Sequence, residues 1–197
     1  MDNKEEKLMQ LSEKYNGHFT TKILNDNGFS KYDISKLLKE GSLERVMRGK
    51  YIYSNALNDE FALLQMNNTK FIYSNETAIY LHNMTGRYPD PFTVTTTHGY
   101  HLRNKDLSIY YVKEEIFLLG MVELESPSGA KIKVYDKERT ICDIIKNKKK
   151  IELQVYIEGI QNYFNSGKPN LKKLSAYAKE LGIKEKVWDV VMLFTTP

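Results

Sequence analysis

The feature that most constrains this chain is the order of short helical and extended patterns within its first 55 or so residues. Helical spacing of apolar residues comes first and alternating spacing follows. The helical segments lie at about residues 4–14, 20–28 and 30–41, and the strands lie at residues 43–46 and 51–53. Three helices followed by a hairpin is the order of a winged helix-turn-helix, so we predict that fold for residues 1–54.

The ends of the second and third helices carry the residues that favour such ends. Thr20 and Thr21 can cap the second helix, and Gly28 permits the left-handed conformation that stops it. Ser30 can cap the third helix, with Asp33 three residues later in the arrangement of a capping box. These signals predict two separate helices on either side of a tight turn.

The third helix has an apolar side and a side suited to DNA. Projected at about 100° per residue, Ile34, Leu37 and Leu38 face one way, toward a core. The opposite side offers cations for phosphates and polar groups for base edges. Its residues are Tyr32, Lys36 and Lys39, flanked by Lys31 and Ser35. This side is what a helix in the major groove requires.

The predicted hairpin adds matching chemistry. Arg45, Arg48 and Lys50 bracket Gly49, which permits a tight tip close to a DNA backbone. Any one of the lysines fits a solvated helix face equally well, but the combined pattern predicts binding to double-stranded DNA. The basic excess is modest, so affinity for a single site should be modest too. The predicted DNA contacts are Lys31, Tyr32, Ser35, Lys36, Lys39, Arg45, Arg48 and Lys50.

After residue 54 the pattern changes to that of a larger domain, which we predict for residues 55–197. Strand patterns occur at 70–73, 92–97, 108–112, 121–125 and 131–135, and helical patterns at 59–66, 75–82, 137–146, 152–164, 170–180 and 184–194. The whole chain is therefore expected to be α/β (α+β), with a mixed sheet and a helical C-terminal half. Ile141, Ile144, Ile157 and Trp188 are among its expected core residues.

Composition narrows the classes of protein to which the chain can belong. No apolar run approaches the ~20 residues that cross a bilayer, and the charged N-terminus lacks the apolar stretch of a signal peptide, so we expect a cytoplasmic protein without membrane contact. The net charge of +4 is compatible with a nucleic-acid partner. Cys142 is the single cysteine, which excludes an internal disulfide, and its helical spacing predicts a small core residue.

Three patterns could suggest catalysis or metal binding, and each has a simpler explanation. Acidic residues and lysines on the 121–135 hairpin resemble a nuclease site, but cross-strand pairing explains them and no Glu-x-Lys triplet occurs there. His98 and His101 lie in loop-like sequence without a nearby cysteine. Arg139 and Asp143 fit a helical ion pair. The nuclease-like residues are Asp106, Glu123, Glu125, Lys131 and Lys133. We expect no enzyme activity, no metal and no cofactor.

A lysine cluster, Lys146, Lys148, Lys149 and Lys150, follows the helix predicted at 137–146. Cations at the end of a helix interact favourably with the negative end of its dipole. The cluster fits a solvated helix end. It also fits an electropositive patch for RNA, for DNA or for an acidic partner.

Several segments resemble the AbiEi family of antitoxins. They are Gly28-Phe29-Ser30, Lys36-Leu37-Leu38, the run from Gly41 to Tyr51, the run from Phe71 to His82, and the run from Tyr135 to Asp143. The pattern Leu-x-Arg-Val-x-Arg-Gly-x-Tyr in the third of these is the most specific. Together the segments span most of the chain, in the order of the family.

The resemblance implies a repressor and antitoxin in a bacterial abortive-infection system of type IV. The N-terminal domain would repress its own operon at inverted repeats, and the C-terminal domain would counteract a cognate nucleotidyltransferase-like toxin. In type IV systems the antitoxin and toxin need not form a stable complex. Self-association on DNA is compatible with this. The alternative is a plain winged-helix transcriptional regulator whose second domain dimerises or senses a ligand, and an enzyme is the third choice.

Overall fold

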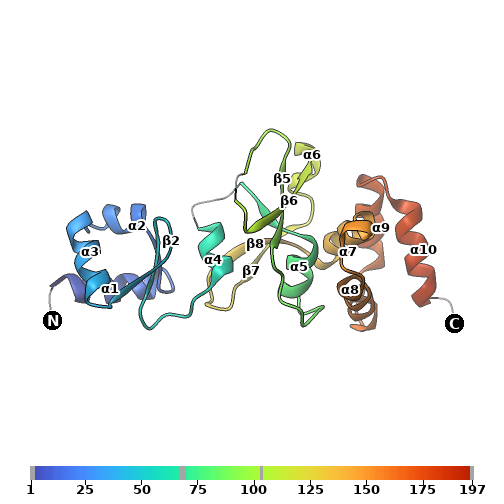
Figure 1. The fold of residues 1–197 in the computed structure, drawn as a ribbon. Helices are drawn as coiled ribbons and strands as arrows, with labels where there is room; N and C mark the ends of the chain where they lie inside the picture. Colours follow the sequence, from blue (N-terminus) through green and yellow to red (C-terminus); the bar gives the residue numbers. More distant parts are fainter. Residues whose placement is uncertain (1–2, 67–69, 103, 196–197) are drawn as a thin grey trace. The chain divides into compact units, whose positions relative to one another are not determined.

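The chain combines helices with two β-sheets, which places it in the α+β class (Figure 1). The computed structural model describes residues 3–66, 70–102 and 104–195. Within these ranges no helix has the length and apolar character that crossing a bilayer requires. The predicted mixture of helices and strands is confirmed.

The chain forms two compact units, and one of them is discontinuous in sequence. Unit 1 comprises residues 1–69 and 124–132, and unit 2 comprises residues 70–123 and 133–197. The division therefore differs from the predicted boundary between residues 54 and 55. The difference arises because the segment after residue 54 and a distant turn at 124–132 belong with the N-terminal helices.

Unit 1 contains four helices and a small antiparallel sheet in the order β1-β3-β2. The helices are α1 (Asn3–Lys14), α2 (Thr21–Asp26), α3 (Lys31–Lys39) and α4 (Glu60–Gln65), and the strands are β1 (His18–Thr20), β2 (Leu43–Met47) and β3 (Lys50–Tyr53). The predicted helices and the predicted hairpin are present. Strand β1 was not predicted, because three residues are too few to show alternation.

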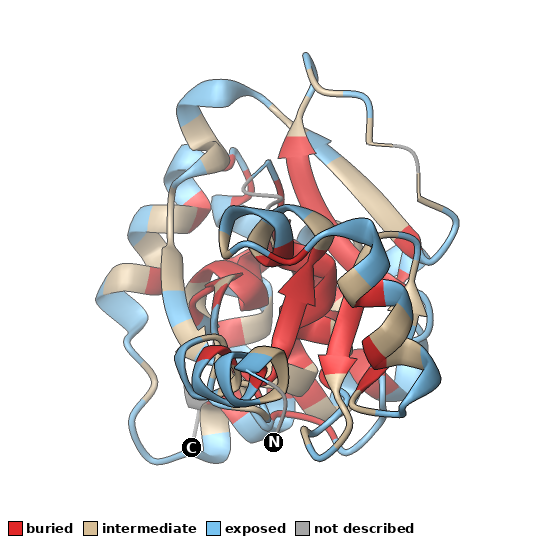
Figure 2. Cartoon of the chain, turned by 90° about the vertical axis from the view of Figure 1, so that its left-hand side faces the viewer, coloured by how far each residue is buried: buried red, intermediate tan, exposed pale blue. Residues whose placement is uncertain are grey.

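The N-terminal helices of unit 1 bury one side each against the small sheet. Leu8 and Leu11 of α1, Ile34 and Leu37 of α3, and Phe19 of β1 lie in one hydrophobic cluster. Figure 2 shows helices with buried positions on one side and exposed positions on the other. Burial of these side chains, at roughly 1.5–3 kcal/mol each, stabilises the three-helix arrangement.

Hydrogen bonds to Asp59 hold the 124–132 segment of unit 1 to the N-terminal segment. This buried carboxylate caps α4 through Ala62 N (3.1 Å) and accepts from Ser128 N (2.9 Å) and Ser128 Oγ (2.6 Å). Asn16 Nδ2 donates to Ser128 O (2.9 Å). Gly17 completes the packing, since its φ is +74° and an added Cβ would lie 2.1 Å from Ala56 Cβ. The 124–132 turn therefore belongs to the fold of unit 1.

Unit 2 is built on a mixed five-stranded sheet in the order β6-β5-β4-β8-β7. Pairs β5–β6 and β4–β8 are parallel, and β4–β5 is antiparallel. The strands are β4 (Ile72–Tyr73), β5 (Phe92–Thr97), β6 (Leu107–Val112), β7 (Met121–Glu125) and β8 (Lys131–Tyr135). The turn joining β7 to β8 is the part that belongs to unit 1. The predicted mixed sheet is confirmed.

The helices of unit 2 follow the predicted order, and the chain after β8 is helical (Figure 1). They are α5 (Asn75–Leu81), α6 (Glu114–Phe117), α7 (Lys137–Lys146), the 3₁₀ turn η1 (Lys148–Lys150), α8 (Leu153–Asn165), α9 (Leu171–Glu180) and α10 (Lys184–Thr195). Only α6 and η1 were not predicted, since each spans about one turn. Gly159 lets α8 approach α5, because an added Cβ there would lie 3.0 Å from Ile79 Cδ1.

The core of unit 2 confirms part of the expected residue list. Ile141 and Ile144 are fully buried, as is Cys142, which is the predicted small core residue. Burial raises the pKa of the Cys142 thiol to about 12. Ile157 and Trp188 were expected in the core but are 43% and 55% exposed. Their helices already bury one side through neighbouring residues, so these two lie on the outer side.

A buried ion pair anchors the loop before β7. Arg139 Nε lies 3.1 Å from both carboxylate oxygens of Asp143, and its Nη1 donates to Ile116 O and Leu119 O, each at 2.8 Å. The guanidinium carbon lies 4.2 Å from the ring centroid of Tyr135. The predicted i,i+4 ion pair is confirmed, and its contacts are those of a structural group.

Candidate nucleic-acid interface and a pocket in unit 2

Helix α3 is fixed at its start by the predicted capping box. Asp33 N donates to Ser30 Oγ (3.1 Å), and Ser30 N donates to Asp33 Oδ2 (2.8 Å). Lys4 Nζ of α1 lies 3.3 Å from the same oxygen. Hydrogen bonds from the backbone and side chain of Ser30 lower the pKa of Asp33. The carboxylate thus holds the N-terminus of α3 against α1.

The outward side of α3 presents most of the predicted contacts. Lys31, Tyr32, Ser35 and Lys39 are exposed, and Tyr32 is 76% exposed. At 100° per residue these four span an arc of about 100°. Lys36, at the edge of this arc, is only half exposed, and its Nζ lies 3.8 Å from Glu40 Oε1. The helix therefore offers a polar, aromatic and cationic strip to its surroundings.

The β2–β3 hairpin presents two more of the predicted residues. Arg45 and Arg48 are exposed, and Gly49 at the turn has φ +72°. Gly49 O accepts from Thr21 N (2.9 Å), the first residue of α2. An added Cβ at Gly49 would lie 3.3 Å from Thr21 Oγ1. The turn is therefore held against the start of α2, with the arginines pointing to solvent.

Lys50 was predicted to contact DNA, but its amine is engaged within unit 1. Its Nζ donates to Leu63 O and, at 3.3 Å, to Leu64 O. Burial lowers the pKa of this amine. Alternation along β3 turns its side chain toward the last turn of α4, where carbonyl oxygens lack helical partners. Lys50 therefore stabilises unit 1 by capping α4.

The lysine cluster of unit 2 is divided between the end of α7 and the separate 3₁₀ turn η1. Lys146 ends α7, whereas Lys148, Lys149 and Lys150 form η1, and all four are exposed. The ammonium group of Lys148 lies 4.9 Å from the ring centroid of Tyr156, and that of Lys150 lies 5.6 Å from that of Tyr110. Two of the lysines thus have defined positions over aromatic rings.

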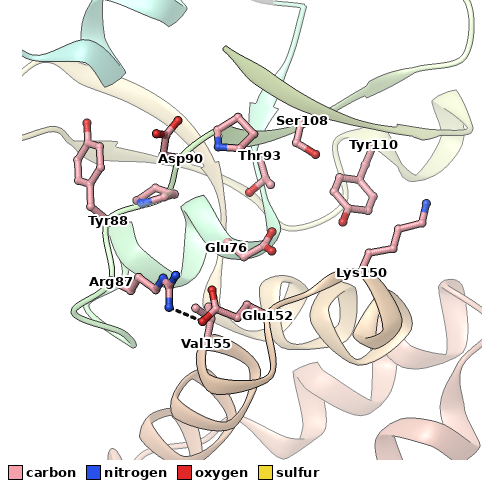
Figure 3. Close-up of a pocket in the computed structure, with 12 residues that line it drawn as sticks. Glu76, Arg87, Tyr88, Asp90, Thr93, Ser108, Tyr110, Lys150, Glu152 and Val155 are labelled. Atoms are coloured by element: carbon pink, nitrogen blue, oxygen red, sulfur yellow. Dashed lines mark hydrogen bonds and ion pairs between the residues drawn. The ribbon is translucent and has the colours of Figure 1, made fainter. Parts of the chain in front are cut away.

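Lys150 also lines a pocket of about 340 Å³ in unit 2 (Figure 3). The other lining residues come from α5, the loop before β5, strands β5 and β6, and the start of α8. They are Glu76, Arg87, Tyr88, Pro89, Asp90, Pro91, Thr93, Ser108, Tyr110, Glu152 and Val155. Sequence reasoning missed this pocket, because four separate stretches of the chain (76, 87–93, 108–110 and 150–155) contribute to it.

The pocket has a carboxylate at its floor and groups of both charges around it, because Asp90 and Glu152 line it as well as Arg87 and Lys150. Glu76 has one carboxylate oxygen that is buried and has no hydrogen-bond partner among the described residues, and burial raises its pKa. Burial and the neighbouring Glu76 raise the pKa of the Tyr110 phenol to about 12. At the opening, the guanidinium of Arg87 pairs with Glu152 (Figure 3). The pocket thus combines hydrogen-bonding groups of both signs with aromatic rings.

The residues of the alternative catalytic patterns are mostly exposed. Glu123 and Glu125 are exposed on strand β7, at the edge of the sheet. His98 stacks on Tyr111, with ring centroids 6.0 Å apart. Among the residues that the structure describes, no three His, Cys, Asp or Glu side chains gather as a metal-binding group would.

Comparison with known proteins adds information on the fold. No family model matches the chain, and no curated protein matches it. Among solved structures, the crystal structure of the Rv2827c protein from Mycobacterium tuberculosis is similar, with a TM-score of 0.66 and 11% sequence identity. The similarity covers 95% of this chain and 74% of the mycobacterial chain. The chain therefore shares its fold with that protein.

Proposed function

We propose that unit 1 binds double-stranded DNA as a winged helix-turn-helix, with α3 in the major groove and the β2–β3 hairpin as the wing. The exposed strip of α3 is the observation that supports this most strongly. A tyrosine that is 76% exposed among two lysines and a serine leaves aromatic surface in water, unless a partner covers it. Lysines contact phosphates, and Tyr32 and Ser35 reach base edges.

We propose that the DNA is an inverted repeat in the promoter of the protein's own operon. A two-fold operator is read by two copies with equivalent faces, one on each half-site. Footprinting on the upstream DNA should then reveal two protected half-sites. A single asymmetric footprint would argue against the inverted repeat.

The DNA-binding proposal is tested by fluorescence anisotropy with the upstream DNA and with a shuffled duplex as control. Arg48→Ala should weaken binding about tenfold, because an arginine at a wing tip can enter a narrow minor groove. Tyr32→Ala should weaken binding to the operator more than binding to the shuffled duplex. If both variants bind the operator as the unmodified protein does, α3 and the hairpin are not the interface.

We further propose that the protein is the antitoxin of this operon and counteracts a nucleotidyltransferase-like toxin through unit 2. The support for this is the resemblance of the runs Phe71–His82 and Tyr135–Asp143 to the AbiEi family. Co-expression with the toxin encoded beside it should restore growth, and an Arg48→Ala variant should restore growth equally well. Absence of such a gene, or absence of rescue, would favour a plain transcriptional regulator.

A further inference from the structure

We propose that the pocket of unit 2 binds a nucleotide, with the base between its aromatic walls and the phosphates on the lysines of η1. This inference does not depend on DNA binding by unit 1. It rests on the lining of the pocket, on the positions of the lysines and on the distribution of charge between floor and rim.

The size and walls of the pocket suit a planar base. Its volume of about 340 Å³ lies at the lower end of the range for small-molecule sites. Tyr88 and Tyr110 line opposite parts of it (Figure 3). Tyr88 is 48% exposed, so much of its aromatic surface is still open to a ligand. Stacking of a base on such a ring is a main source of affinity in single-strand nucleic-acid sites.

The rim of the pocket suits phosphate. Lys150 lines the pocket, and its ammonium group is held over Tyr110 at 5.6 Å. Lys149 precedes it on η1 and is exposed. Successive side chains of a 3₁₀ turn diverge by about 120°, and among the lysines of η1 Lys150 is the one that lines the pocket. Phosphate groups bind such ammonium groups through charge-assisted hydrogen bonds.

The floor of the pocket distinguishes a nucleotide from a simple anion. Glu76 repels an inorganic phosphate placed deep in the pocket. A base places N–H donors, rather than charge, beside Glu76. Guanine is favoured, because its ring N–H and amino group donate side by side to a carboxylate. Such donors stabilise the ionised form of a carboxylate that is otherwise poorly solvated.

The same chemistry could be supplied by a free nucleotide or by the end of an RNA strand. Isothermal titration calorimetry on the full chain separates these sources with GTP, ATP, CTP, UTP, guanosine, inorganic triphosphate and a short single-stranded RNA ending in G. Binding of GTP ahead of the other nucleotides identifies a free nucleotide. Tighter binding of the RNA than of any free nucleotide, with the RNA displaced by excess GTP, identifies a strand end.

Three variants test the assignment of residues. Tyr110→Ala should lower affinity for both GTP and guanosine by at least about fivefold. The double variant Lys149→Ala/Lys150→Ala should lower affinity for GTP but not for guanosine, and it should reduce the salt dependence. Glu76→Gln should reduce the preference for guanine over adenine. Lys186→Ala, an exposed lysine of α10, is the matched control and should bind as the unmodified protein does.

Circular dichroism melting confirms that each variant is folded. The proposal is overturned if none of the nucleotides or the RNA binds at about 1 mM, or if Tyr110→Ala and the double lysine variant bind unchanged. It is also overturned if inorganic triphosphate binds as tightly as GTP, because the pocket would then contribute nothing to base recognition.

Discussion

The cations of α3 and the lysines of η1 are chemically alike, but their surroundings differ. On α3, Lys31 and Lys39 lie on a convex helix beside an exposed tyrosine. On η1, Lys150 lies over the ring of Tyr110 at the mouth of a pocket. A convex strip can follow a continuous duplex, whereas a pocket can enclose only one unit of a polymer or a small molecule.

The comparison teaches that the number of basic residues says little about what a surface binds. Basic residues are visible in a sequence, and both regions have them. Whether a basic surface suits a DNA duplex or a small molecule depends on its curvature and on its aromatic neighbours. Both features are set by tertiary packing. The two regions can therefore be separated by variants that change charge in one region at a time.

Charge reversal should give the largest effect. The double variant Lys39→Glu/Arg48→Glu should lose about 100-fold in operator affinity, because two attractive phosphate contacts become repulsive. The matched variant Lys149→Glu/Lys150→Glu should change operator affinity less than about threefold and abolish nucleotide binding. Both are measured by anisotropy and calorimetry. Equal loss of operator affinity in the two variants would break the distinction between the regions.

Lys50→Met should lower the stability of unit 1 by about 1–3 kcal/mol. The reason is that the carbonyl oxygens of Leu63 and Leu64 lose a buried donor. The salt dependence of operator binding should not change, because Lys50 does not face solvent as a phosphate contact would. Urea denaturation and a salt titration measure the two effects. Lys39→Met is the control, and it should leave stability unchanged while reducing the salt dependence of operator binding. A reduced salt dependence in Lys50→Met would instead place Lys50 in the interface.

Asp59 should give unit 1 a stability that depends on pH. Burial acts to raise its pKa, but hydrogen bonds from Ser126, Ser128 and Ala62 outweigh this and lower it below 3.8. A carboxyl whose pKa is lower in the folded state contributes stability above its unfolded value, and loses it as pH falls through the folded value. The melting temperature of the unmodified protein should therefore fall more than that of Asp59→Asn between pH 5 and pH 2. Parallel curves would contradict this role.

Lys36→Ala should have the smallest effect, with less than about twofold loss of operator affinity. Its ammonium group pairs with Glu40 and lies at the edge of the exposed strip. Lys39→Ala should cost several-fold and reduce the salt slope by about one unit. A larger effect at Lys36 than at Lys39 would show that the helix presents a different face to DNA.

Local signals in the sequence predicted most of the elements. The capping box at Ser30 and Asp33 and the glycine after α2 are short-range features, and the structure confirms both. The division into units was not predictable, because Ser128 joins Asp59 from 69 residues away in sequence. The exposure of Trp188 was missed for a related reason, since helical periodicity alone cannot say whether another element covers a face.

The residues of the candidate sites also divide into those that local patterns predicted and those that they did not. Periodicity placed Tyr32, Ser35 and Lys39 on the outward side of α3, and they are exposed there. The engagement of the Lys50 amine was not predicted, because its acceptors lie on α4, which the hairpin pattern does not include. Glu76 and Tyr110 gave no signal at all. Residues of a pocket come together through sheet order, and a single sequence does not reveal sheet order.

The 124–132 turn has a consequence for the synthesis of the protein. A ribosome releases α1, α2, α3 and the hairpin first, but Ser128 is translated much later than the carboxylate it must reach at Asp59. At 5–20 residues per second, this interval is on the order of several seconds. During that time the nascent N-terminal segment lacks residues 124–132, which complete unit 1. Unit 1 is therefore complete only after residue 132 has been made. If unit 1 binds DNA as proposed, a translation product that ends before this turn would compete poorly for the operator.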